Sequence, residues 1–211
     1  IQIVALDLVG RGGDHAAIAD IISALTSDDL EVKEQAVETL GQLGGLAAIE
    51  ALLRALRAEH SFLDRPITRA LIQIGSEAVP YLVDALADPN ETIRWHAAEA
   101  LADIGDPRAI ESLVGVLEDA DSAVRWNAAR GLAHLGEPAL IKLLEALETR
   151  PLTPWLSQGA RYVLRHVALG RSRKELRALA GALDHPTASV EVPLRAEEAI
   201  AALTPAPLVS A

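Results

Sequence analysis

Apolar side chains recur along this chain with the spacing of amphipathic helices. Ile93, Ala97, Ala100, Leu101 and Ile104 fall on one face of a helix that turns about 100° per residue. Another apolar helical segment and a short acidic turn come before this helix, and the same order of segments follows directly after it. The pattern predicts pairs of helices that pack through their apolar faces.

The pattern repeats about every 31 residues along the chain. An apolar residue opens the first helix of each unit, at Ile18, Ile49, Val79, Ile110, Leu140 and Leu176. A glycine ends the second helix, at Gly13, Gly44, Gly75, Gly105 and Gly136. Glycine suits this place because the chain leaves a helix through a left-handed conformation. The spacing predicts an all-α α-solenoid, a superhelix of about five and a half antiparallel helix pairs.

The turns inside the repeats carry residues that suit helix starts. Asp29, Asn90 and Asp121 precede second helices, where their side-chain oxygens are expected to accept hydrogen bonds from free N–H groups. Thr153 followed by Pro154 predicts the same kind of start in the fifth unit.

Two arginines recur at one position of the repeat, each directly before a tryptophan. Arg94 and Arg125 are therefore candidates for ligand binding. We interpret both as structural residues that hold the preceding acidic turns, which contain Asp88 and Asp119.

We expect one continuous solenoid across residues 1–211. The predicted boundaries are 1–14 for the second helix of a partial repeat, 15–45, 46–76, 77–106, 107–137, 138–171 and 172–205 for the helix pairs, and 206–211 for a tail. The opening helix lacks its partner, which we take as a hint that more protein precedes residue 1.

Composition narrows the possible classes of function. Half of the residues are hydrophobic but only 3% are aromatic, so the core is expected to consist of Leu, Ala, Ile and Val. The net charge of −11 argues against a nucleic-acid partner or an anionic membrane surface. The absence of cysteine excludes a thiolate nucleophile and a cysteine-ligated metal. No apolar run reaches about 18 residues, so no membrane span is expected.

The repeat resembles a known family. Ile93-Arg94 and Val124-Arg125 open the pattern V/I-R-x-x-A-A-x-A/G-L-x-x-I/L-G-D/E, which resembles HEAT repeats of the short, phycobilisome-lyase-like (E–Z) type. The resemblance implies an α-solenoid. It leaves the function open, since such repeats occur in scaffolds, chaperones, lyases and a few enzymes.

The face of the second helices opposite the apolar stripe is the predicted partner-binding face. Its residues are Trp95, His96, Glu99, Trp126, Asn127, Arg130, His134 and Tyr162. Tryptophan is enriched at interaction hot spots, and His166 extends the same surface. Trp155, in the long turn of the fifth unit, either covers this surface or fills a gap. The alternative is that Trp95 and Trp126 lie flat over their own helices as structural cover.

A row of charges crosses the repeats at one position of the second helices. Glu38, Arg69, Glu99 and Arg130 alternate in sign. We interpret the row as an inter-repeat ion-pair ladder, or as charged contacts with a partner.

The sequence offers few combinations of residues that carry chemistry. His96 and Glu99 have the helical spacing used in metal sites, with Asp103 and His134 as further candidates, but Arg130 would compete for the Glu99 carboxylate. Deoxyhypusine hydroxylase, a HEAT-like enzyme, uses His-Glu dipeptides to bind its di-iron site, and this chain has none. The run GRGGD at 10–14 resembles a nucleotide loop, but helix termination explains it.

We therefore expect a non-catalytic, cytoplasmic scaffold that binds a protein or peptide through its second helices. We expect no cofactor and no metal, and neither nucleic acid nor membrane as a partner. The alternative, which the resemblance implies, is a bilin lyase or chaperone-like factor that acts on a chromophore-carrying protein.

Overall fold

The computed structural model describes residues 18–58, 62–167 and 173–204, and in these ranges it contains twelve α-helices. The prediction of an all-α repeat solenoid is confirmed. The predicted helix at 1–14 and tail at 206–211 lie outside the described residues. The chain divides into two compact units, Ile1–Asp106 and Pro107–Ala211. Whether the whole chain is one continuous solenoid stays a prediction.

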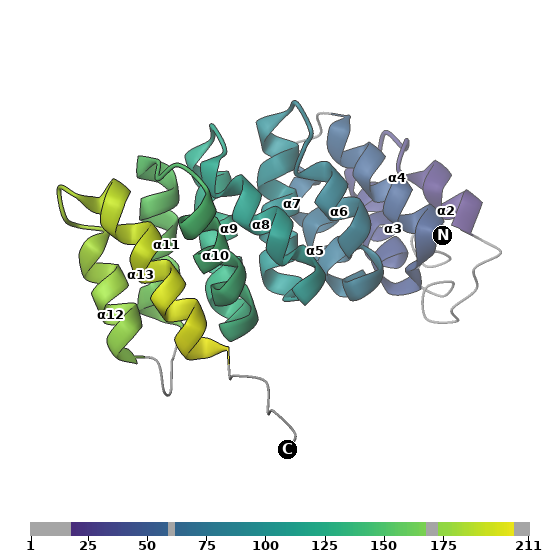
Figure 1. Cartoon of the computed structure of the whole chain (residues 1–211). Helices are drawn as coiled ribbons and strands as arrows, with labels where there is room; N and C mark the ends of the chain where they lie inside the picture. Colours follow the sequence, from purple (N-terminus) through teal and green to yellow (C-terminus); the bar gives the residue numbers. More distant parts are fainter. Residues whose placement is uncertain (1–17, 59–61, 168–172, 205–211) are drawn as a thin grey trace, which may run out of the picture. The chain divides into compact units, whose positions relative to one another are not determined.

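The first unit consists of helices in two layers (Figure 1). The helices are α2 (Ile18–Ala24), α3 (Leu30–Leu43), α4 (Gly45–Arg57), α5 (Asp64–Ile74), α6 (Val79–Ala85) and α7 (Glu91–Ile104), with a short 3-10 helix, η2, at Gly75–Glu77. The second helices α3, α5 and α7 pack in sequence, and α2 packs on α4. Leu40, Ile67 and Leu101 are fully buried on these helices, as the apolar stripe predicts.

The second unit begins with the same arrangement. Its helices are α8 (Ile110–Gly115), α9 (Ser122–Leu135), α10 (Glu137–Thr149), α11 (Pro154–His166), α12 (Arg173–Ala182) and α13 (Ala188–Leu203), with 3-10 helices η3 (Pro107–Ala109) and η4 (Val116–Glu118). The second helices α9 and α11 pack together, and the first helices α8 and α10 do the same.

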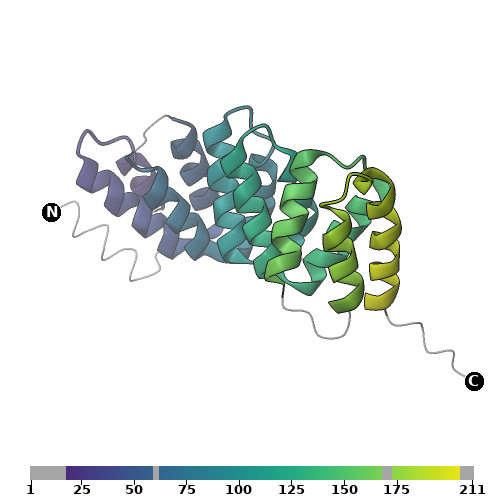
Figure 2. The same ribbon diagram turned by 90° about the vertical axis from the view of Figure 1, so that its left-hand side faces the viewer.

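The last helix pair joins this unit in a different way. Figures 1 and 2 show α12 and α13 side by side, and α10 packs mainly on α13. The buried side chains Val192, Ala196 and Ala199 form the interior face of α13. A second helix thus lies on the layer of first helices, so the pair formed by α12 and α13 does not continue the layering of the earlier pairs.

The predicted helix starts are confirmed. Asp29, Asn90 and Asp121 each accept a backbone N–H at the start of their helices. Thr153 accepts the N–H of Leu156, with proline at the first position of the helix. These bonds satisfy N–H groups that a helix cannot pair internally.

Glycine ends the second helices with a positive φ, as predicted, at Gly44, Gly75, Gly105 and Gly136. Of these four glycines only Gly105, with φ 65° and ψ 31°, lies in the left-handed helical region. Gly44 combines its positive φ of 67° with a ψ of −160°. A residue with a Cβ would be strained at either place.

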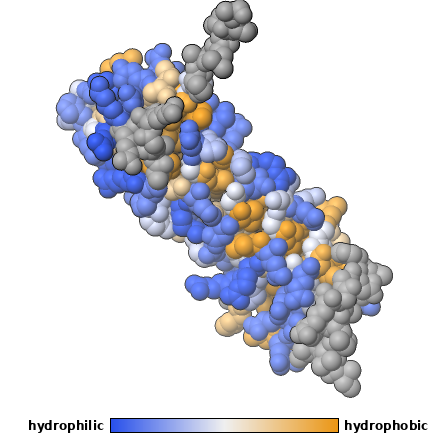
Figure 3. Space-filling model, turned by 90° about the horizontal axis from the view of Figure 1, so that it is seen from below, coloured by the Kyte–Doolittle hydropathy of each residue, from blue (hydrophilic) through white to orange (hydrophobic). Residues whose placement is uncertain are grey.

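The described surface is mixed in polarity. Figure 3 shows hydrophilic and hydrophobic side chains reaching the same face. The large hydrophobic side chains exposed among the described residues are Leu30, Leu46, Phe62, Trp126, Trp155, Val190 and Leu194. In the part of the chain that the structure describes, no helix is long and apolar enough to cross a membrane.

Candidate functional site: an aromatic groove in the second unit

Helices α9 and α11 border a groove of about 410 Å³ in the second unit. It is lined by Ser122, Arg125, Trp126, Ala129, Trp155, Gln158, Gly159, Arg161, Tyr162, Arg165 and His166. This volume lies in the range of known ligand pockets. The two helices are both second helices of their repeats, which is where the sequence predicted a partner-binding face.

Three rings form a continuous aromatic wall in this groove. Trp126 meets Tyr162 edge-on, with ring centroids 4.8 Å apart and planes at 62°. Tyr162 stacks on His166, with centroids 4.0 Å apart and planes at 26°. The Nδ1 atom of His166 also lies 2.7 Å from the carbonyl oxygen of Tyr162, one turn earlier in α11. These contacts fix the three rings while 55% of Trp126 remains exposed.

The start of α11 is anchored to the preceding repeat. The hydroxyl of Thr153 donates a hydrogen bond of 2.6 Å to Oε1 of Glu118. A few residues later, Gly159 lies so close to Leu117 that an added Cβ would come within 2.7 Å of its side chain. The missing side chain therefore lets α11 pack closely against the 3-10 helix η4.

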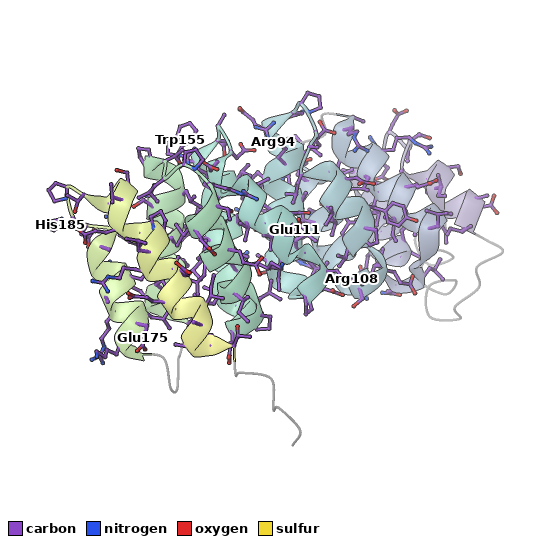
Figure 4. All side chains as sticks on the ribbon, viewed as in Figure 1. Arg94, Arg108, Glu111, Trp155, Glu175 and His185 are labelled. Atoms are coloured by element: carbon purple, nitrogen blue, oxygen red, sulfur yellow. The ribbon has the colours of Figure 1, made fainter. Side chains whose placement is uncertain are left out.

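Trp155 stands next to this anchored start, near the top of the view in Figure 4, and 44% of it is exposed. The guanidinium carbon of Arg125 lies 4.7 Å from the centroid of its ring. A cation in this position is attracted by the electron-rich face of the indole. Trp155 and Arg125 thus hold each other in place in the groove.

Arg125 and Arg94 hold the preceding turns, as predicted. Arg125 Nη1 donates to the carbonyl oxygens of Asp119 and Ala120, at 2.6 and 2.9 Å. Arg94, labelled in Figure 4, makes the equivalent bonds to Asp88 and Pro89, at 2.9 and 3.1 Å. The acceptors in these bonds are backbone carbonyls rather than the carboxylates of the acidic turns.

The structure brings only some of the predicted face residues together. Trp126 and Tyr162 meet in the groove together with His166, and Trp155 takes the first of its two predicted places, next to these rings. Arg130 and His134 belong to α9 but do not line the groove; Arg130 is half-buried and His134 is exposed. Trp95 and Glu99, both half-buried, belong to α7 in the first unit.

His96 and Asn127, which the sequence places on the predicted partner-binding face, are buried. Their exposed fractions are 4% and 6%. The reason is that α7 packs against both α5 and α6, and α9 against α8 and α11, so the buried arc is wider than one apolar stripe. Each residue is followed by two alanines that are themselves buried, and this is the signal that the sequence offered.

His96 is part of a polar cluster inside the first unit. Its Nδ1 lies 2.8 Å from the hydroxyl of Thr68, which donates its own hydrogen to the carbonyl oxygen of Asp64 at 2.8 Å. His96 Nδ1 therefore carries the proton and donates to Thr68. Burial lowers the pKa of His96; Asp64 opposes this effect and Arg65 adds to it.

The His96–Glu99 pair does not form part of a metal cluster. Nδ1 of His96 lies 3.7 Å from Oε2 of Glu99. Among the residues that the structure describes, no group of three or more His, Cys, Asp or Glu side chains is placed to hold a metal ion.

A second hollow, also of about 410 Å³, lies between α3 and α5 in the first unit. Its lining is Glu34, Val37, Glu38, Pro66, Arg69, Ala70 and Gln73. Glu38 and Arg69 face the same hollow, but no ion pair joins them in this described region, and Glu38 accepts a bond of 3.4 Å from Gln42. The predicted ion-pair ladder is therefore not formed at this step.

Comparison with known proteins identifies the family. The profile of the family described as HEAT repeats matches residues 1–72, 63–121 and 79–165, which together cover residues 1–165. The chain belongs to the HEAT-repeat family. The predicted resemblance to HEAT repeats of the phycobilisome-lyase-like type is confirmed, since a bilin biosynthesis protein and a phycocyanobilin lyase subunit are among the relatives.

Two curated relatives and one solved structure show the range of this family. Deoxyhypusine hydroxylase from Danio rerio is 35% identical over 101 residues, or 46% of this chain and 33% of that protein. The bilin biosynthesis protein RpcF from a Synechococcus strain is 35% identical over 97 residues, or 46% of this chain and 45% of that protein. The chain thus matches less than half the length of either relative.

The solved structure is human deoxyhypusine hydroxylase in complex with glycerol. It is 22% identical, with a TM-score of 0.47, and the alignment covers 92% of this chain and 88% of that chain. At this identity the likeness concerns the fold alone.

Proposed function

We propose that this chain is a non-catalytic scaffold that binds a segment of a partner protein in the groove between α9 and α11. One observation carries the proposal. Trp126 is 55% exposed although Tyr162 fixes its ring edge-on, in a groove of about 410 Å³. A large ring that is held in place but exposed removes much apolar surface from water on binding and loses little side-chain entropy.

The alternative interpretation of Trp126, as flat cover for its own helix, fits this geometry less well. Its ring contacts Tyr162 on the neighbouring helix α11, and more than half of its surface stays exposed. The half-buried Trp95 fits that interpretation better, since its ring lies edge-on to His96 with centroids 4.4 Å apart. Glu99, Arg130 and His134 remain candidates for contacts outside the groove.

The proposal is tested with the variant Trp126→Ala/Tyr162→Ala. Proteins captured by the full chain from its source cells are quantified by mass spectrometry, and direct binding is then measured by calorimetry with the purified partner. The matched control is Phe62→Ala, which removes an exposed aromatic ring from the first unit. If the folded double variant retains the partners of the wild type, the groove is not the binding site.

A second candidate function is that of a bilin lyase or chaperone-like factor. The 35% identity to the bilin biosynthesis protein RpcF favours it. Co-expression of this chain with a bilin and a phycobiliprotein subunit tests the candidate by the visible absorbance of covalently attached chromophore. Absorbance equal to that of cells without the chain would exclude this role for that bilin and subunit.

A hydroxylase role has less support on this chain. The match to deoxyhypusine hydroxylase covers 33% of that enzyme, and the sequence has no His-Glu dipeptide. Enzymes are among the relatives, but the groove and the exposed ring of Trp126 favour a binding role for this chain.

A further inference from the structure

The groove has a charge opposite to that of the chain as a whole. The chain carries 30 acidic residues against 19 lysines and arginines, for a net charge of −11. Three of the groove residues are arginines, at 125, 161 and 165, and a histidine lies beside them, whereas no lining residue is acidic. The positive charge of the groove therefore lies next to its aromatic rings.

Two of these arginines keep their charge available. Arg165 is exposed and forms no ion pair with any residue in the described ranges. Arg125 is fixed by bonds to carbonyl oxygens and by the ring of Trp155, and such bonds orient the guanidinium without neutralising it. Arg161 differs, because it forms an ion pair with Asp184.

We propose that the groove recognises an acidic linear segment of a partner protein that carries at least one large apolar side chain. The apolar side chain packs on Trp126 and Trp155, and carboxylates accept hydrogen bonds from Arg125 and Arg165. Arginine suits this task because its planar donors match a carboxylate in two-point contact. The inference rests on the proposed function and adds the chemical class of the partner.

The other polyanion that fits arginines and exposed rings is single-stranded nucleic acid, whose bases stack on aromatic side chains. The acidic balance of the chain disfavours it, because a long polyanion would also meet the repulsion of the 30 carboxylates, none of which lines the groove. A short peptide segment meets only the groove itself.

Peptide display tests the inference without a known partner. Random dodecapeptides on phage are panned against the immobilised full chain, and in parallel against Trp126→Ala. We expect the peptides that depend on Trp126 to be enriched in Asp and Glu and to contain Phe, Leu, Ile or Trp. Enrichment of neutral or basic peptides that depend on Trp126 would overturn the acidic class and leave the binding groove intact. No enrichment that depends on Trp126 would contradict both proposals.

Charge reversal then locates the contact. The best peptide from the display is synthesised, and its affinity is measured by fluorescence anisotropy. Arg165→Glu is expected to weaken binding about tenfold or more. Its control is Arg177→Glu, which makes the same charge change at an exposed site on α12 outside the groove. Equal losses in both variants would mean that only net charge matters, and the specific contact would be refuted.

Two further arms separate competing explanations. Raising the ionic strength should weaken binding of the wild type more than that of Arg165→Glu, because screening acts on the charge that the variant lacks. A twelve-nucleotide oligo-dT should not displace the peptide at equal concentration. Displacement that depends on both Trp126 and Arg165 would assign the groove to nucleic acid instead.

Discussion

The hydroxyl of Thr68 on α5 and the Nδ1 atom of His96 on α7 lie 2.8 Å apart inside the first unit. This bond joins neighbouring repeats through residues 28 positions apart in the sequence. The ring is also close to Asp64 and Glu99, at 3.8 and 3.7 Å. A residue selected from the sequence as part of a binding face thus contributes to the packing of two repeats.

Stability of the first unit should fall as the pH drops below about 6.5. Burial lowers the folded-state pKa of His96 from its usual 6.5, so the unfolded chain takes up the proton first. Above pH 6.5 the neutral ring of His96 makes its full contribution to the free energy of unfolding. This contribution is lost as the pH falls from 6.5 to the lowered pKa of the folded state. Urea unfolding at a series of pH values measures this loss.

The variant His96→Asn isolates the contribution of this ring. It keeps a donor toward Thr68 but has no titrating group, so the decrease in stability between pH 6.5 and 5 should become smaller. His134→Asn is the control, since it removes an exposed histidine and leaves His96 in place. A decrease of equal size in the wild type and His96→Asn would show that other groups cause it.

Asp88→Ala should destabilise the first unit by about 1–2 kcal/mol. Oδ1 of Asp88 accepts a hydrogen bond of 3.0 Å from the N–H of Asn90, and Oδ2 accepts one of 2.9 Å from Nε of Arg57. Partial burial raises the pKa of Asp88, but these two partners outweigh it and hold the pKa below its usual value of 3.8. Arg57→Ala is the comparison: its side chain is 48% exposed, so it should cost less than about 1 kcal/mol. Denaturant unfolding that ranks the two variants the other way would contradict this account.

Gly41→Ala should cost about 1–3 kcal/mol of unfolding free energy. A Cβ at this position would lie 2.9 Å from the Cα of Ala70, so that α3 and α5 would have to separate. Gly181→Ala, in α12, would meet nothing within 4 Å and should be neutral or stabilising by up to about 1 kcal/mol. Thermal unfolding of the two variants should therefore shift in opposite directions, or shift only for Gly41→Ala.

Leu132→Ala should cost about 2–5 kcal/mol, because Leu132 is fully buried on α9 and its loss leaves a cavity. The matched variant Leu46→Ala makes the same change on a side chain that is 53% exposed, and it should stay within about 0.5 kcal/mol of the wild type. Chemical denaturation distinguishes the two. Similar costs at both positions would mean that the repeat pattern misplaces the core.

Local features were predicted well because each depends on neighbours in the chain. The caps at Asp29, Asn90 and Asp121 bond to N–H groups two or three residues away, and Arg94 reaches carbonyls within six residues. Such contacts return with the repeat, so the sequence shows them several times.

The groove was predicted in part for the same reason. Trp126 and Tyr162 stood out as rings on second helices, and the repeat implied that these helices are adjacent. The basic character of the groove was not predicted, since Arg161 and Arg165 belong to a unit with a weak repeat signal.

The sequence by itself determined the all-α repeat, the helix ends and most of the core, because these follow from periodicity and from bonds between near neighbours. Only the tertiary structure decided that His96 and Asn127 are buried, that α13 packs on α10, and that one groove brings Trp126 and Trp155 together with three arginines. The physical reason is that burial of a helical side chain depends on how many helices surround it. That number is set by packing between segments far apart in the chain, which a single helical period does not encode.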